Sequence, residues 1–276
     1  MPIEQSRDPK EFAAFELSGW DSTINGYDVA LGSVARQTVA PMLDAVAVRA
    51  GWDVLDLCCG PGMLAAGALA RGAKATGLDF SSAAVKLART RVPNGHFQEG
   101  DAQALPFAAA SFDAAVCGYG LMHLPEPAAA LRETLRVLRP GGRAAFAVWD
   151  LNGKGFMLVY EAARARGRTD IPLPHGPDFF QFGSPERLSA ALTEAGFVDV
   201  KAHSFAQDWR INDAQQYIGA ILTGTVRAGA VLAAQTGDAA LGVRAYIADY
   251  LERYRAPGGE LIVPMPAIIG SGAKPA

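Results

Sequence analysis

Short apolar runs alternate with alanine- and leucine-rich segments along the middle of the chain. Five runs have the length and composition of buried strands, and we expect them at residues 53–57, 74–78, 95–99, 112–117 and 143–149. Helix signals lie between them, with capping serines before some segments and glycine or proline after them, at 63–71, 81–91 and 126–138. Because strands that alternate with helices form parallel sheets covered on both faces, this pattern predicts a doubly wound, Rossmann-like α/β sheet.

The sequence beyond residue 150 is less regular. We expect helices at 152–170, 184–196, 213–234 and 241–255, a proline-rich loop at 171–177, and two more strands at 197–205 and 260–269. The expected architecture is one domain, 1–276, with a mostly parallel seven-stranded sheet and a helical cap. The core is expected from about 50–150, 184–206 and 260–271, and the cap from about 1–45, 151–183 and 210–256.

Composition narrows the function classes. The 276 residues carry a formal net charge of −3, so there is no overall basic field to attract nucleic acid. The three cysteines, Cys58, Cys59 and Cys117, lack the spacing of a metal site and favour a reducing compartment. Segment 1–16 lacks the apolar core of a signal peptide, and no uncharged stretch is long enough to span a bilayer. We therefore expect a cytoplasmic protein with neither a nucleic-acid nor a membrane partner.

A glycine turn follows the first expected strand, in the sequence Asp56-Leu-Cys-Cys-Gly60-Pro-Gly62. Open α/β sheets bind ligands at this end of their strands, and glycines let the backbone approach a ligand closely. The turn formally fits the dinucleotide fingerprint, which leaves an NAD(P)-dependent oxidoreductase or a turn that binds nothing as alternatives. Asp56 lies within the strand, where a buried carboxylate must orient the loop or meet a cationic ligand.

Two further acids end neighbouring strands. Asp79 follows Gly60 by 19 residues, close to the spacing of an acid that binds ribose hydroxyls, and Asp101 follows the third strand. Each could be a solvated loop acid by itself. Together with Asp56 they place carboxylates along one edge of the sheet. Asp56 and Asp101 argue against the oxidoreductase, because a pyrophosphate does not need them and a carboxylate near the phosphates would repel them.

Several segments, in family order and at family spacing, resemble the motifs of class I S-adenosylmethionine (SAM)-dependent methyltransferases. The resemblance is to the small-molecule type, including enzymes of quinone and natural-product biosynthesis. The segments are 54–62, 77–81, 99–102, 105–107, 111–113 and 138–142. The resemblance implies that the cofactor is SAM and that the protein is an enzyme. A SAM-binding module that has lost catalysis is equally compatible with these motifs.

The resemblance also implies which residues bind the cofactor. Asp79 accepts hydrogen bonds from the ribose, and Asp101 accepts one from the adenine amino group. Apart from the resemblance, the guanidinium of Arg36 suits the carboxylate of SAM. The full expected set is Asp56, Gly60, Gly62, Asp79, Phe80, Asp101, Ala102, Gly118, Tyr119 and Arg36. Arg36 could instead lie on an ordinary helix surface. Cys58 and Cys59 stand where the family usually has small residues, so we interpret them as apolar filler rather than a reactive pair.

The methyl acceptor needs its own site. Methyl transfer from a sulfonium depends mainly on positioning, which contributes on the order of 7–11 kcal/mol, and a general base adds about 10²–10⁴-fold. His123 follows the fourth strand and could be that base, another substrate contact or a structural residue. Tyr27 resembles the aromatic lid of small-molecule members. We therefore name His123 and Tyr27 as the candidate catalytic residues.

Aromatic residues of the expected cap suggest a small, apolar or aromatic acceptor. The residues expected to contact it are Trp20, His175, Phe180 and Trp209, with Phe179 and Phe182 nearby. Ordinary core packing would account for the same residues. The sequence thus predicts a SAM-dependent methyltransferase for a small metabolite, with no metal site and with the acceptor atom undecided.

Overall fold

Seven strands form the main sheet of the computed structural model, which describes residues 8–276. Their order is β3-β2-β1-β4-β5-β9-β6, and all neighbours are parallel except β9, which runs antiparallel to both β5 and β6. The strands are β1 (Asp53–Leu57), β2 (Lys74–Asp79), β3 (His96–Glu99), β4 (Phe112–Gly118), β5 (Leu138–Trp149), β6 (Val198–Phe205) and β9 (Ala267–Ala273). The expected doubly wound, mostly parallel sheet of seven strands is confirmed. Residues 1–7, which begin the expected cap and the segment assessed as a signal peptide, lie outside the described residues.

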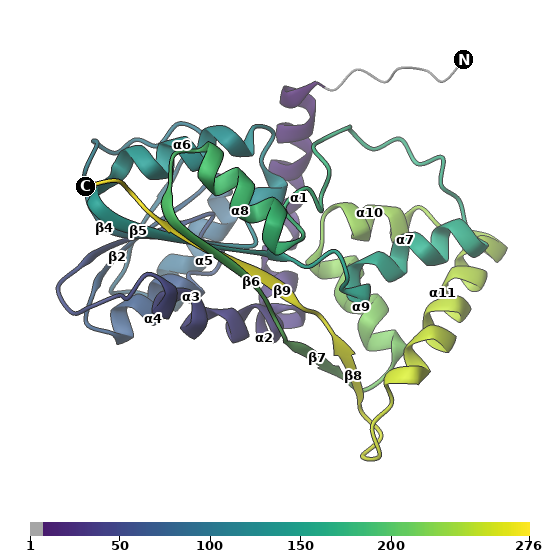
Figure 1. Cartoon of the computed structure of the whole chain (residues 1–276). Coiled ribbons are helices and arrows are strands. Elements are labelled where there is room, and N and C mark those ends of the chain that lie inside the picture. Colours follow the sequence, from purple (N-terminus) through teal and green to yellow (C-terminus); the bar gives the residue numbers. More distant parts are fainter. Residues whose placement is uncertain (1–7) are drawn as a thin grey trace.

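The central strands are apolar because both faces of the sheet are covered. Val54, Leu55 and Leu57 of β1 are at most 2% exposed, and the neighbouring β4 is buried from Ala114 to Cys117. Helices α3 (Val39–Ala45), α4 (Met63–Ala70) and α5 (Ser82–Arg91) cover one face, and α6 (Pro127–Val137) and α8 (Pro185–Glu194) cover the other (Figure 1). Helix α3, within the segment expected in the cap, thus belongs to the layers of the core.

Local capping explains where two of these helices begin. The Ser81 hydroxyl accepts a hydrogen bond from the Ala84 N–H at 3.1 Å, and the Ser184 hydroxyl accepts one from the Arg187 N–H at 3.3 Å. The sequence predicted capping serines at the starts of these two helices, with Ser81 or Ser82 as the candidates for the first. Strand β5 begins earlier than expected, at Leu138, because a register shift accommodates the residues between Leu138 and 143 that were expected only to stop the helix.

The remaining helices gather at one end of the sheet (Figure 1). They are α1 (Pro9–Ala30), α2 (Gly32–Ala35), α7 (Lys154–Arg166), α9 (Ala214–Gly224), α10 (Arg227–Ala233) and α11 (Gly237–Leu251), with the short 3₁₀ segments η1 (Arg36–Thr38), η2 (Leu121–His123) and η3 (Glu252–Tyr254). The helix expected at 213–234 is broken, because Thr225 is extended. The Thr225 hydroxyl then accepts from the Gly229 N–H at 2.9 Å, which supports the first turn of α10.

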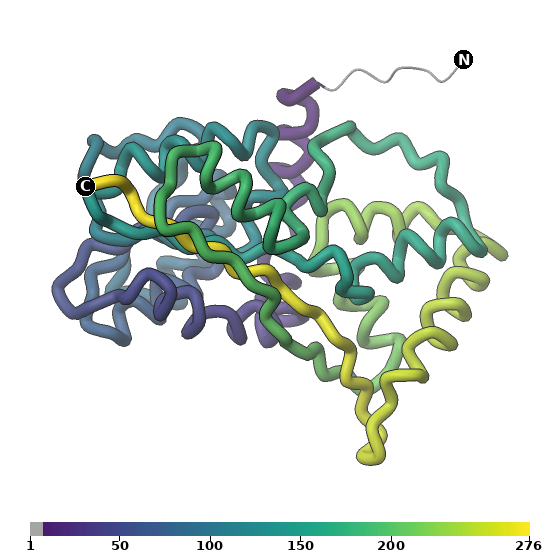
Figure 2. Tube along the Cα trace, viewed as in Figure 1, coloured from purple at the N-terminus to yellow at the C-terminus, as the bar shows by residue number. Residues whose placement is uncertain are grey.

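The structure has two strands where the sequence predicted a single strand at 260–269. Strand β8 (Leu261–Pro264) ends before Pro266, whose ring nitrogen cannot donate to a ladder, and β9 begins at Ala267. Strand β7 (Asp208–Ile211), which the sequence did not predict, pairs antiparallel with β8. Figure 2 shows that this small sheet continues the paired segments of β6 and β9 towards the cap helices.

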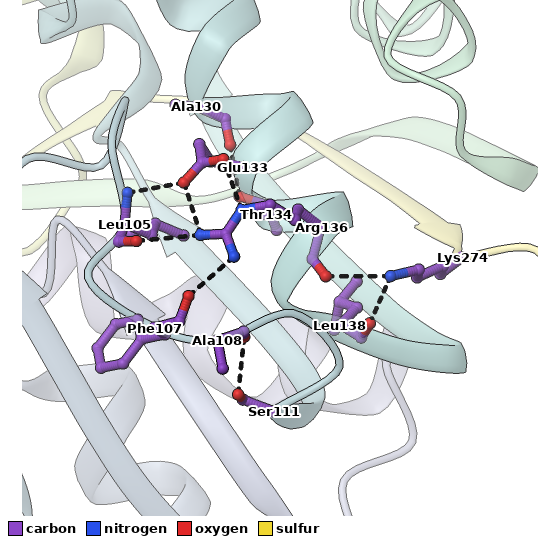
Figure 3. Close-up of polar contacts among 10 residues, drawn as sticks. All are labelled: Leu105, Phe107, Ala108, Ser111, Ala130, Glu133, Thr134, Arg136, Leu138 and Lys274. Atoms are coloured by element: carbon purple, nitrogen blue, oxygen red, sulfur yellow. Dashed lines mark hydrogen bonds and ion pairs between the residues drawn. The ribbon is translucent and has the colours of Figure 1, made fainter.

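A partly exposed ion pair between Arg136 and Glu133 of α6 fixes the connection that follows β3 (Figure 3). The Arg136 guanidinium donates to the carbonyls of Phe107 at 2.8 Å and Leu105 at 3.0 Å. The Glu133 carboxylate accepts from both Arg136 and the Leu105 N–H. The Lys274 ammonium donates to the Arg136 carbonyl at 3.0 Å, which ties the C-terminal residues to the same point. Helix α6 thereby holds the loop that borders the site described next.

Candidate active site

The turn between β1 and α4 lies at the carboxyl edge of the sheet. Cys58, Gly60 and Gly62 all have left-handed backbone conformations, with φ of +51°, +50° and +81°. The Asp56 carboxylate accepts a hydrogen bond from the Ala65 N–H at 2.9 Å, in the first turn of α4. Burial raises the pKa of Asp56 well above its usual range. Asp56 therefore orients the loop, which is one of the two roles expected for it.

Asp79 faces this turn from the end of β2. Its carboxylate accepts from the Gly60 N–H at 2.8 Å and from the Ser81 N–H at 3.0 Å, one bond to each oxygen. Burial raises the pKa of Asp79 to about 6, although these two bonds oppose the shift. Each oxygen keeps a further lone pair. The arrangement fits a ligand that brings hydroxyl donors and positive charge, as SAM does.

Two small hollows flank Asp79 and the glycine turn. The first is lined by Asp79, Phe80, Asp101 and Ala102, together with His123. The exposed Asp101 carboxylate also accepts from its own loop at the Gln103 N–H, at 2.8 Å. The carboxylates at the ends of β2 and β3 thus border one hollow, as the sequence predicted.

The second hollow lies on the other side of the turn. Its lining residues come from β1, β4 and their following loops, from the start of α4, and from the segment that runs from α1 to α3. They include Asp56, Gly60, Gly118, Tyr119 and Tyr27. Tyr119 is held in place because its ring stacks on Trp149 at 4.1 Å and its hydroxyl bonds the Gln207 side chain.

Two residues expected at the cofactor lie elsewhere. A Cβ on Gly62 would lie 3.1 Å from Val92 and 3.2 Å from Phe97, so Gly62 faces the core. The half-exposed Arg36 side chain pairs with Asp28 at 2.8 Å. The expectation that Arg36 reaches the cofactor is not met, because this buried carboxylate, which the sequence did not identify as its partner, holds the guanidinium.

A larger cavity of about 900 Å³, which includes open solvent, lies between the sheet edge and the cap. Aromatic rings from α1, β5, α7 and the proline-rich connection form much of its wall. They are Trp20, Tyr27, Trp149, Phe156, Tyr160 and Phe179. Polar groups are few and include His123, Thr225 and Arg227. An apolar cavity with a few converging polar groups is typical of a small-molecule site.

The cavity and the two hollows adjoin one another, because the same side chains line more than one of them. Asp79, Phe80 and His123 belong to both the cavity and the first hollow. Gly60 and Tyr27 belong to both the cavity and the second hollow. A ligand that occupies both hollows therefore passes one wall of the aromatic cavity.

Helix α1 is fixed over this junction. The Asp21 carboxylate accepts from the Ser81 hydroxyl at 2.6 Å and from the Ala83 N–H at 3.2 Å, which ties α1 to the start of α5. This contact places Trp20 and Tyr27 of α1 beside the sheet edge. Their rings meet edge to face at 5.5 Å.

His123 lies in the 3₁₀ turn after β4, with its side chain 16% exposed. The Trp20 ring meets it edge-on at 4.9 Å, and the Phe179 ring lies 5.7 Å away. Its Nδ1 lies 2.9 Å from Oε2 of Glu16, a fully buried acid on α1. Sequence reasoning missed Glu16, although an acid four residues after Phe12 on the apolar face of a helix is a usable signal.

Tyr27 differs from His123 in its acid–base chemistry. Burial raises the pKa of Tyr27 far above that of a free tyrosine, and nearby Tyr119 and Asp28 act in the same direction. Its hydroxyl therefore stays protonated at neutral pH and can donate a hydrogen bond, but it is poorly suited to act as a base.

The structure places the four residues expected to contact the acceptor in different parts of the molecule. Trp20 lines the aromatic cavity. Phe180 does not line it, and its ring packs against the ring of Phe179, a residue of the cavity wall, at 5.0 Å. His175 borders a separate groove with Phe182. Trp209 is 2% exposed and packs against Tyr217 in the cap. The expectation is therefore wrong for His175 and Trp209, because aromatic content alone does not distinguish a cavity wall from a packed core.

The cysteines agree with their interpretation as filler. Burial raises the pKa of the Cys59 thiol, and the neighbouring Cys117 thiol together with burial raises that of Cys58, which disfavours the reactive thiolates. Within residues 8–276, three or more histidine, cysteine or acidic side chains nowhere gather in a way that could hold a metal ion. In the same described range, no helix is both long and apolar enough to cross a membrane.

The strand order, the glycine turn and the acids at successive strand ends define a nucleoside-binding α/β protein of the methyltransferase class. Comparison with known proteins agrees. Residues 55–146 match the family described as "Methyltransferase domain". A 2-phytyl-1,4-naphtoquinone methyltransferase of Thermosynechococcus vestitus is 35% identical over 179 residues, which cover 58% of this chain and 78% of that protein. A demethylmenaquinone methyltransferase of Beutenbergia cavernae is 43% identical over 149 residues, which cover 52% of this chain and 60% of that protein.

Solved structures share the fold. A putative methyltransferase of Bacillus halodurans has a TM-score of 0.56 at 19% identity, covering 87% of this chain and all of that one. A phosphoethanolamine N-methyltransferase of Haemonchus contortus has a TM-score of 0.60 at 17% identity, and the match covers 96% of this chain and 60% of that one. The chain belongs to the class I SAM-dependent methyltransferases. It is a methyl-transferring enzyme with SAM as its cofactor, and these comparisons give no support to an oxidoreductase or a non-catalytic module.

Proposed function

We propose that this enzyme methylates a small hydroxylated aromatic molecule, such as a reduced quinone, held in the aromatic cavity. The observation that carries the proposal is the shared lining: Asp79 and His123 border both the cofactor hollow and that cavity. The residues that would hold the cofactor therefore also border the cavity that would hold the acceptor. The names of the quinone methyltransferase relatives support this acceptor class.

We assign the cofactor to the two hollows. Bound SAM supplies a methyl group on a positively charged sulfur, which is already activated for transfer. Asp79 accepts from the ribose hydroxyls, and Phe80 packs on the adenine. Asp101 and the Ala102 N–H bind the adenine edge. The backbone at Gly60, Gly118 and Tyr119 borders the methionine end, and Asp56 supports that loop from behind through its bond to α4.

In the cavity, the chain's own groups position the acceptor and take its proton. The aromatic wall excludes water and holds a flat apolar ring. His123 is the one histidine among the residues that line the cavity, and we assign it as the general base. The protonated Tyr27 hydroxyl acts as a lid and hydrogen-bond donor at the junction with the cofactor.

The expected setting of the enzyme stays a prediction. Cys58, Cys59 and Cys117 are all unpaired, which supports a reducing compartment such as the cytoplasm. The net charge of −3 supports a small-molecule acceptor rather than nucleic acid.

A methyl-transfer assay tests the proposal. Purified enzyme is incubated with methyl-labelled SAM and either reduced 2-methyl-1,4-naphthoquinone, reduced longer-chain naphthoquinones, or simple phenols, and products are identified by mass spectrometry. We expect label on at least one reduced quinone and a large loss of turnover in His123→Ala. Binding of SAM without transfer to any member of the panel would contradict the proposed acceptor class.

A further inference from the structure

The position of Glu16 is unusual for a carboxylate. It lies on α1 with 0% of the residue exposed, and its Oε2 lies 2.9 Å from Nδ1 of His123. Its other oxygen, Oε1, is buried and has no hydrogen-bond partner. No lysine or arginine within residues 8–276 forms an ion pair with Glu16, so His123 is its sole ionic partner in that range.

Burying a carboxylate with one oxygen unsatisfied costs free energy that the fold must recover elsewhere. An ionised carboxylate can only accept hydrogen bonds, so the contact requires a proton on Nδ1 of His123. In the neutral ring the other nitrogen, Nε2, is then bare and able to accept a proton. With Glu16 ionised, the contact selects the one neutral form of the ring in which the free nitrogen is Nε2.

We propose that Glu16 is the positioning residue of the base: it fixes the orientation and tautomer of His123 and stabilises the imidazolium that forms during transfer. The inference rests on the proposed role of His123. The other ionisable side chains that line this cavity are Tyr27 from α1, Cys58 from the glycine turn, Asp79 from β2, Tyr119 from the turn after β4, Tyr160 from α7 and Arg227 from α10. Asp79 is separately engaged by backbone N–H groups, and among residues 8–276 Glu16 alone bonds the ring.

The proton balance is simple. The O–H bond of the acceptor breaks, its proton moves to Nε2, and the electron pair enters the new bond to the methyl carbon from oxygen or, by conjugation, from a ring carbon. The methyl–sulfur bond breaks with its electrons going to sulfur. His123 then returns the proton to solvent. Where a ring carbon has been methylated, that carbon loses its own proton and the oxygen takes one up from solvent, so that one proton is released overall in either case. Glu16 remains a carboxylate throughout.

Histidine tautomers can be read without any acceptor. The chain has four histidines, so ¹⁵N-histidine labelling gives a simple spectrum in which His123 is assigned by its absence in His123→Ala. At pH 8 we expect the wild-type ring to carry its proton on Nδ1, and Glu16→Leu to lose that preference. A wild-type ring protonated on Nε2 alone, or on both nitrogens, overturns the proposal even if no variant folds.

Kinetics provide the second readout, with reduced 2-methyl-1,4-naphthoquinone as acceptor. Glu16→Gln should lower kcat roughly 10- to 100-fold, within the range of general-base effects, while the Kd for SAM changes less than about twofold. The matched control is Glu11→Gln, an exposed acid on the same helix, which should leave kcat unchanged. In the His123→Ala background Glu16→Gln should have no further effect on kcat, because both residues act through one ring.

The two proposals fail differently. If His123→Ala leaves kcat unchanged, His123 is not the base, and both the proposed mechanism and the role of Glu16 fall. If His123→Ala lowers kcat while Glu16→Gln does not, or if the two losses multiply, only the role of Glu16 is overturned. A loss of SAM affinity in Glu16→Gln equal to the loss of kcat would likewise reduce Glu16 to a structural residue.

Discussion

Replacement of Asp79 by asparagine separates two effects of the buried carboxylate: its cost to the stability of the fold and its contribution to SAM binding. Asp79 is 5% exposed, and its pKa of about 6 against an ordinary 3.8 means that the folded state disfavours the charged form. A shift of this size corresponds to about 3 kcal/mol at neutral pH. Because the folded-state pKa is raised, this carboxyl favours folding only while it is protonated. Its effect on stability weakens as the pH rises from about 4 through 6.

The variant should therefore keep or gain stability and lose cofactor affinity. Asparagine removes the charge but can still accept one of the two backbone bonds, from Gly60 or Ser81. The lost bond costs about 1–3 kcal/mol, which is similar to the charge cost relieved. Losing the acceptor for the ribose and the attraction to a cationic ligand should weaken SAM binding by roughly 1–3 kcal/mol, or about 5- to 150-fold.

Calorimetric titration with SAM at pH 7 and pH 5 measures this. A carboxyl with a pKa of about 6 is about nine-tenths ionised at pH 7 and one-tenth at pH 5. Wild-type affinity should fall about tenfold between these pH values, and Asp79→Asn should be nearly flat. Glu99→Gln is the matched control, since Glu99 pairs with Asp79 in the sheet but is exposed. Unchanged SAM affinity in a folded Asp79→Asn protein would refute the assignment.

Three further predictions follow from the site geometry. Tyr27→Phe should keep kcat within about tenfold of wild type, because a buried hydroxyl with a raised pKa is not a base; a loss beyond 10³-fold in a steady-state assay would contradict this. Gly62→Ala should lower the free energy of unfolding by about 2–4 kcal/mol and Gly60→Ala by about 1–2, measured by urea titration, because both have positive φ but only Gly62 is crowded. Equal losses would count against that packing. The Cys58 thiol should react slowly with iodoacetamide at pH 7.5 in the folded protein, and labelling as fast as in urea would show that its thiolate is accessible.

Features set by local sequence could be predicted. Apart from its two aspartates, strand β1 is apolar because neighbours cover both of its faces. Ser81 and Ser184 cap helices through bonds to residues three positions ahead. The carboxylates of Asp79 and Asp101 border the same hollow because parallel strands end at one edge of the sheet. These signals need no knowledge of distant contacts.

Features set by contacts between separate segments of the chain could not be predicted from the sequence. Strand β7 exists through its pairing with β8, about fifty residues later. Arg36 is held by a buried Asp28 that nothing in the local pattern identifies as its partner. Trp209 and Trp20 look alike in sequence, yet one is packed in the cap and the other lines the cavity. Glu16 and His123 are 107 positions apart and meet only because α1 crosses the sheet edge.

The central claim is that the cofactor lies in the two hollows with its sulfur facing the aromatic cavity. A crystal structure with S-adenosylhomocysteine, the demethylated cofactor, tests this most directly. We predict the ribose hydroxyls on Asp79, the adenine between Phe80 and Ala102, and the sulfur on the side of the glycine turn that His123 and Tyr27 border. A cofactor bound outside these hollows, or with its sulfur turned away from the aromatic cavity, would contradict the account.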